Sequence, residues 1–201
     1  MKSWPRSYQP AFALWAILIC FSLVALIAAV FSPLLQWRDP IYWAASFSGI
    51  LALVIMLFQP LLVTGVLTLP TGLNRRRFHR NLGVLLVVMI VIHVATLWLT
   101  SPPDVIDALL LVSPTPFSLW GVIAMWAIIG AAAMVAMRRA LTLRFSTWQR
   151  MHLALTAIAV AGTIAHTLLI DGIMEQMSKV ALCILAGLAL VAGLRARRKR
   201  I

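Results

Sequence analysis

Two stretches of the chain decide the fold: RRRFHRNLGVLLVVMIVIHVATLWL at residues 75–99 and STWQRMHLALTAIAVAGTIAHTLLI at residues 146–170. The first stretch starts with three arginines, and the second has Arg150 as its fifth residue. Each continues as an apolar run of about 20 residues, which is the length that a helix needs to cross a bilayer. Each also carries two histidines, and a polar ionisable group inside a span indicates a function because its burial in lipid is costly.

The rest of the chain is equally apolar. Of the 201 residues, 63% are hydrophobic and 11% are charged, which is more apolar surface than one soluble core of this size can bury. Six apolar runs with short connections predict an all-α, polytopic membrane bundle with no separate soluble domain. We expect spans at residues 11–31, 42–66, 78 or 81–99, 119–137, 147–170 and 177–194.

Three local features refine this prediction. The first apolar run is long for a signal peptide and no small-x-small site closes it, so we expect a retained helix after a tail of residues 1–10. Pro60 predicts a kink near residues 56–60. The longest loop, residues 100–116, has room for a short surface helix at 105–112, and residues 195–201 form a basic tail.

Lysine and arginine residues predict the orientation. Of the 17 basic residues, 15 lie in the two tails and in two loop regions with their helix ends, at residues 75–80 and 138–150. Only Arg38 and Lys179 lie at the other end. Because cationic loops stay in the cytoplasm, both termini are predicted inside, in a multi-pass protein of the bacterial inner membrane. The net charge of +12 comes from these loops and tails, where it orients the protein in its partner, the lipid bilayer. Nucleic-acid binding is not expected, because no stripe of basic residues alternates with aromatic residues.

The four histidines have a regular spacing. His79 and His93 are 14 residues apart, as are His152 and His166, and 14 steps of a helix come within about 40° of whole turns. The members of each stretch therefore share a face and stand roughly 21 Å apart along the axis. Since the two helices run in the same direction, His79 pairs with His152 (the inner pair) and His93 with His166 (the outer pair).

Facing imidazoles at two depths favour one or two b-type haems, each with its iron between two histidines. The faces between the histidines are apolar and partly small, as a flat ring requires, although small residues are also typical of ordinary helix packing. These faces comprise Leu82, Gly83, Leu86, Ile90, Leu155, Thr156, Ala159 and Thr163. A zinc or di-iron site fits less well, because no carboxylate shares these faces.

Haem propionates need cationic or hydrogen-bonding partners. Arg77, Arg80 and Arg150, with Arg75 and Arg76 nearby, flank the inner pair and are the predicted cofactor-binding cations. Their alternative role is the positive-inside signal alone. At the outer pair the sequence offers only Arg38 with some hydroxyl and Trp groups, so the outer partners stay undetermined.

The same two stretches resemble the third and fifth helices of the ferric reductase-like transmembrane superfamily, and the resemblance covers about residues 42–194. That superfamily includes ferric reductases, NADPH oxidases and the haem-binding membrane subunit of the bacterial methionine sulfoxide reductase system (MsrQ type). The paired histidines carry the resemblance, with a weaker match at Arg80-Asn81-Leu82-Gly83. It implies that His79 and His152 bind an inner haem and that His93 and His166 bind an outer one.

The resemblance leaves two types open. Ferric reductases carry a flavin and nicotinamide domain after the last helix, and no Gly-rich phosphate loop follows here, so the chain length favours the stand-alone bacterial subunit. In that subunit one inner position lacks histidine, so the presence of His79 favours the ferric reductase type.

We therefore expect an oxidoreductase component that relays electrons and has no catalytic side chain. A separate cytoplasmic flavin reductase, carrying FMN or FAD, or quinol would be the donor, and the acceptor would lie on the outer face near residues 100–116. One alternative is a haem-binding subunit dedicated to a periplasmic reductase such as methionine sulfoxide reductase. Another is a haem-free small transporter or assembly protein, against which the spans show no paired acid and base and no inverted broken helices.

Overall fold

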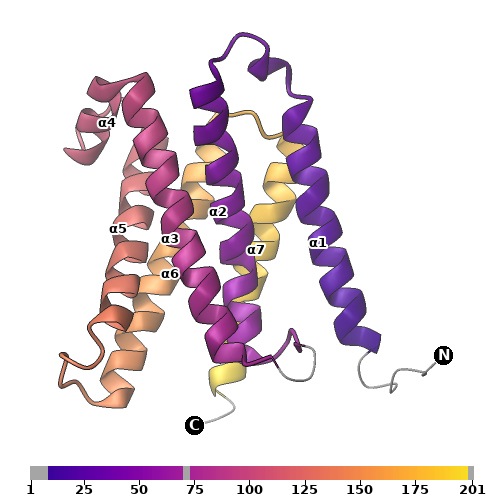
Figure 1. Cartoon of the computed structure of the whole chain (residues 1–201), viewed down its shortest axis with the longest axis vertical. Helices are drawn as coiled ribbons and strands as arrows, with labels where there is room; N and C mark the ends of the chain where they lie inside the picture. Colours follow the sequence, from indigo (N-terminus) through magenta and orange to yellow (C-terminus); the bar gives the residue numbers. More distant parts are fainter. Residues whose placement is uncertain (1–8, 70–72, 199–201) are drawn as a thin grey trace.

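The computed structural model describes residues 9–69 and 73–198, so most of the predicted N-terminal tail and the end of the predicted basic tail lie outside the described residues. The regular structure within these ranges is entirely helical (Figure 1). Its elements are α1 (Gln9–Val30), the 3-10 turn η1 (Pro33–Leu35), α2 (Pro40–Thr64), α3 (Arg75–Thr100), α4 (Pro102–Leu109), α5 (Pro116–Ala136), α6 (Phe145–Leu169) and α7 (Gln176–Arg198).

Six of these helices are long and apolar enough to cross a membrane, namely all except α4. The predicted all-α, six-span bundle is therefore confirmed, and the chain is an integral multi-pass membrane protein that is embedded in a lipid bilayer. The start of α1 and the end of α7 lie at the same end of the bundle (Figure 1). We call this the arginine-rich end and the opposite one the α4 end; which of them faces the cytoplasm stays a prediction.

Several helix bounds differ from the prediction for local reasons. The third span begins at Arg75 and not at residue 78 or 81, because the Asn74 side chain accepts hydrogen bonds from the backbone N–H groups of Arg76 and Arg77. Helix α2 continues through Pro60 and ends at Thr64, and the following Gly65 has a φ of 79°, which suits the residue after a helix end.

The short surface helix is also shifted. It covers Pro102–Leu109 and not residues 105–112. Prolines at 102 and 103 are compatible with a first helical turn, where their missing N–H groups cost nothing. Leu111, with a φ of 61°, lies just past the helix end.

The bundle consists of two hairpins and two covering helices. Helix α2 packs along α3, and α5 packs along α6, while α7 packs on α2 and α6, and α1 lies at the edge against α7 and α2 (Figure 1). The two histidine-bearing helices, α3 and α6, make few close backbone contacts with each other. Each is supported by its own hairpin partner, so the hairpins hold α3 and α6 apart.

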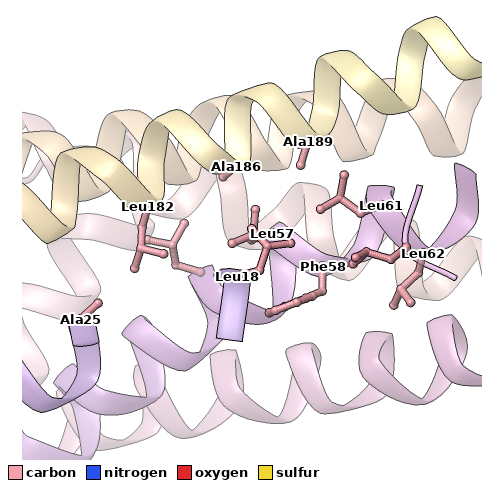
Figure 2. Close-up of a cluster of buried hydrophobic side chains, with 11 residues drawn as sticks. Leu18, Ala25, Leu57, Phe58, Leu61, Leu62, Leu182, Ala186 and Ala189 are labelled. Atoms are coloured by element: carbon pink, nitrogen blue, oxygen red, sulfur yellow. The ribbon is translucent and has the colours of Figure 1, made fainter. Parts of the chain in front are cut away.

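Two buried apolar clusters fix this arrangement. One joins α1, α2 and α7, and Figure 2 shows Leu57 and Leu61 of α2 beside Ala186 and Ala189 of α7. The other joins the hairpins midway between the histidine pairs, and it comprises Ala52, Ile55, Met56, Leu86, Ala127, Ile128, Ala159 and Val160. Since Leu86 and Ala159 were predicted to lie between the histidines on the inward faces, this cluster forms an apolar layer between the two pairs.

Candidate functional site

The outer pair is brought together as the spacing predicts. The rings of His93 on α3 and His166 on α6 have centroids 6.5 Å apart and planes at 86° to each other. A metal–imidazole bond is about 2 Å long, as zinc sites illustrate. Two such bonds with half an imidazole ring at each end span a distance of this order, so the separation suits one metal ion between the two rings.

Backbone carbonyl groups orient both outer imidazoles. Nδ1 of His93 lies 2.7 Å from the carbonyl oxygen of Ala45 on α2, and Nδ1 of His166 lies 2.8 Å from that of Phe117 on α5. Because a carbonyl oxygen only accepts, the proton is on Nδ1 in each ring. Nε2 therefore keeps its lone pair, which is the arrangement of metal-binding histidines whose other nitrogen is hydrogen-bonded.

A glycine lies beside each outer imidazole, four residues after the carbonyl that the ring contacts. A Cβ atom at Gly49 would stand 3.1 Å from Nδ1 of His93, and a Cβ atom at Gly121 would stand 2.7 Å from Nδ1 of His166. The absence of a side chain at these positions lets the rings approach the neighbouring helix closely enough for the hydrogen bonds.

The outer pair lines a cavity of about 730 Å³, which we call the outer cavity. Its volume is within the range of about 300–1,000 Å³ that is typical of cofactor and ligand sites. Its walls come from α2, α3, α4, α5, α6 and α7, and its lining is mostly apolar. Polar groups gather toward the α4 end, among them Arg38, Ser101, Asp104 and Lys179.

The inner pair is also close together but is held differently. His79 and His152 are near enough to interact electrostatically, and they lie next to the backbone carbonyls of Gln59 and Ala131. Neither imidazole forms a hydrogen bond with its neighbouring carbonyl: Nδ1 of His79 and Nδ1 of His152 are buried without a partner. Oε1 of Gln59 is also buried without a partner. Such orphaned polar atoms are rare in native interiors and indicate a place where a further group belongs.

The four carbonyl groups repeat the spacing of the histidines. Ala45 and Gln59 are 14 residues apart on α2, and Phe117 and Ala131 are 14 apart on α5. Each hairpin is therefore in antiparallel register along its length, so that both of its histidines face its other helix at equivalent positions. The hairpins are structural equivalents, which the sequence reveals only through the histidines.

Ring stacking supports His152. The Trp148 indole lies parallel to the His152 imidazole, with centroids 5.4 Å apart and planes at 5°. The indole is anchored by a hydrogen bond from its Nε1 to the Met134 carbonyl, and Arg138 lies 5.4 Å from its ring. Phe145 stacks on the same indole at 6.2 Å. Thus stacking takes the place of the hydrogen bond that orients each outer imidazole.

The comparison with known protein families agrees with this geometry. Residues 48–163 match the family described as ferric reductase like transmembrane component. The match covers more than half of the chain. It includes His79, His93 and His152 and three of the four carbonyl positions, whereas Ala45 and His166 lie just outside it. The chain belongs to the ferric reductase-like transmembrane family. No curated protein and no solved structure matches it.

Membership of the ferric reductase-like family indicates a general role in electron transfer at the membrane. The donor set fits the kind of cofactor that such a role requires. Within the described ranges, no group of three or more His, Cys, Asp or Glu residues could hold a bare metal ion. Two imidazoles on either side of a cavity suit a metal that brings its other ligands with it, as haem iron does.

The basic residues near the two histidine pairs differ in how deeply they are buried. Arg77, Arg80 and Arg150 are exposed at the arginine-rich end, and their role toward an inner cofactor stays a prediction. Lys179, by contrast, was predicted only as an orientation signal, yet it lines the outer cavity and is 4% exposed. An ionisable residue in the first turn of an otherwise apolar span was the signal for it.

Proposed function

We propose that this ferric reductase-like chain is a haem b-containing electron-transfer protein of the membrane. It takes electrons from a cytoplasmic donor, a separate flavin reductase or quinol, and passes them to an acceptor on the outer face, such as a metal complex or a periplasmic reductase. The observation that carries this proposal is the outer pair: perpendicular imidazoles 6.5 Å apart, each with Nδ1 bonded to a backbone carbonyl, on the wall of one cavity.

The residues have distinct tasks in this proposal. His93 and His166 would hold the outer haem through Nε2, and His79 and His152 would hold the inner one. A bound haem supplies a one-electron couple, whose potential depends on its ligands and on the polarity around it. The apolar layer around Leu86 and Ala159 excludes water between the two sites, and Gly49 and Gly121 keep the outer imidazoles in place.

A haem count on the detergent-purified chain tests the proposal. The pyridine haemochrome assay, with protein quantified in the same sample, should give two haems b per chain. His93→Ala and His166→Ala should each remove the outer haem, and His79→Ala and His152→Ala should each remove the inner one. A haem that has lost one of its two histidine ligands is held too weakly by the other to be retained. Each single variant should therefore lose close to one haem per chain.

Ser22→Ala is the matched control. Ser22 is buried in α1, where its hydroxyl donates to the Leu18 carbonyl, and it lies away from both histidine pairs. The variant should keep both haems. Protein that contains no haem although it was produced with an ample haem supply would refute the proposal.

A further inference from the structure

Lys179 is a buried cation of unusual setting. It lies in the first turn of α7, is 4% exposed and lines the outer cavity together with His93 and His166. Its ammonium group donates one hydrogen bond, to the Ile170 carbonyl at 3.1 Å. An ammonium has three N–H donors, so two of them have no acceptor among the described residues.

Glu175, the acidic residue best placed in the sequence to pair with Lys179, bonds to backbone groups instead. Glu175 precedes Lys179 by four residues, a spacing at which opposite charges on a helix usually pair. Its carboxylate oxygens instead accept hydrogen bonds from the backbone N–H groups of Met177 and Ser178, both at 2.8 Å. Asp104 and Asp171 also line the cavity, but both are exposed, and within the described part of the chain neither forms an ion pair with Lys179.

A buried charge without a partner is strongly unfavourable, so such groups in proteins are paired or bind a ligand. Since Lys179 faces a cavity, the partner that its setting calls for is an anion inside that cavity. The cavity also contains the outer histidines, and its second cation is Arg38, which is exposed and lies 4.6 Å from the Tyr42 ring. Two cations, one deep and one near the surface, match a ligand with two carboxylates.

We propose that the ammonium of Lys179 binds a carboxylate in the outer cavity, namely a propionate of the haem that His93 and His166 hold, with Arg38 available to the second propionate. This inference rests on the proposed function and adds a positioning residue to it. It also names cationic partners for the propionates of the outer haem, which the arginines of the arginine-rich end are too far away to contact. The same chemistry could be offered by a free small carboxylate, so the experiment separates the two sources.

The test measures haem content and midpoint potentials of the purified chain by spectroelectrochemical titration, and the outer haem is assigned by its loss in His93→Ala. Lys179→Met should keep the inner haem unchanged and shift the reduction equilibrium of the outer haem at least roughly tenfold toward the ferric form, about 59 mV for one electron. Removing a positive charge near the iron disfavours the reduced state, because reduction adds an electron. Lys179→Arg, which keeps the charge, should stay close to the wild type.

Arg195→Gln is the matched control, because it removes an exposed cation at the other end of α7; the outer potential should not move. If Lys179→Met also loses the inner haem, Lys179→Gln takes its place with the same expectation. An outer potential equal to the wild type overturns the inference, as does a wild-type potential that depends on added acetate and loses this dependence in Lys179→Met. A wild-type chain without haem would instead refute the proposed function.

Discussion

The imidazole of His166 lies against the backbone of Gly121, so closely that a Cβ atom at residue 121 would stand 2.7 Å from Nδ1. The equivalent contact of His93 with Gly49 is 3.1 Å. Real Cβ atoms do not approach other atoms as closely as 2.7 Å, so a methyl group at residue 121 must move the ring. The ring would then lose its hydrogen bond to the Phe117 carbonyl.

We therefore expect Gly121→Ala to weaken the outer haem site. A lost hydrogen bond costs about 1 kcal/mol and an off-rotamer ring about 0.5–1.5 kcal/mol. Together they correspond to a roughly tenfold or larger loss of haem affinity, since about 1.4 kcal/mol is a factor of ten. Haem retention during dialysis against apomyoglobin would measure it.

A glycine series supplies the control. Gly49→Ala should have a smaller effect than Gly121→Ala, because its contact is 3.1 Å. Gly187→Ala on α7 should have almost none, because a Cβ atom there would meet only Cδ1 of Ile164, at 3.7 Å. Equal haem retention in all three variants would contradict the role of Gly49 and Gly121 in letting the imidazoles approach the neighbouring helix.

The inner pair should depend on Trp148 and not on a carbonyl. Trp148→Leu removes the parallel indole that supports His152, and an aromatic contact of this kind is worth about 0.5–1.5 kcal/mol. We expect a loss of inner haem affinity of up to about tenfold and altered electron paramagnetic resonance of that haem, whose signal reports the orientation of the imidazole planes. Trp148→Phe, which keeps an aromatic ring beside His152, should retain part of the affinity for the inner haem.

Trp126→Leu is the comparison for this experiment, since Trp126 is 58% exposed on α5 and contacts neither pair. Its spectra should equal those of the wild type. A change of the outer haem signal in Trp148→Leu, with the inner signal intact, would show that the stack does not act on His152.

The two histidine pairs were predictable because they depend only on helix periodicity and on the direction of the spans. The glycine seats were not, because the contacts of Gly49 and Gly121 depend on how far each hairpin's helices slide past one another. That register is set by the turns, such as the one at Gly65, and by packing across the hairpin. The sequence shows a lysine at residue 179 but does not show that its side chain is buried. That burial depends on how α7 packs against the outer cavity.

Glu175 should make the start of α7 sensitive to acid. The backbone N–H groups of Met177 and then Ser178 bond to its carboxylate and hold its pKa below the ordinary value of 4.5. A carboxylate whose pKa is lowered by folding stabilises the fold above its unfolded pKa, and this contribution is lost as the pH falls through the folded pKa. Glu175→Ala should therefore be less stable than the wild type at neutral pH, and the difference should vanish in strong acid.

Thermal unfolding in detergent, followed by circular dichroism from neutral pH down to about pH 3, would show this convergence. Asp171→Asn is the companion variant, because Asp171 is an exposed acid of the same loop without these cap bonds. A difference between Glu175→Ala and the wild type that stays constant with pH would contradict the capping role.

The orientation in the membrane can be tested with single cysteines. In a background with Cys20→Ala and Cys183→Ala, Trp37→Cys places a thiol at the α4 end, at a position that is 89% exposed, and Thr142→Cys places one at the exposed loop of the arginine-rich end. Because cationic loops stay in the cytoplasm, an impermeant maleimide on intact cells should label Trp37→Cys and leave Thr142→Cys unlabelled. After permeabilisation both should react. The reverse pattern on intact cells would place the inner pair, and with it the electron donor, on the outer side.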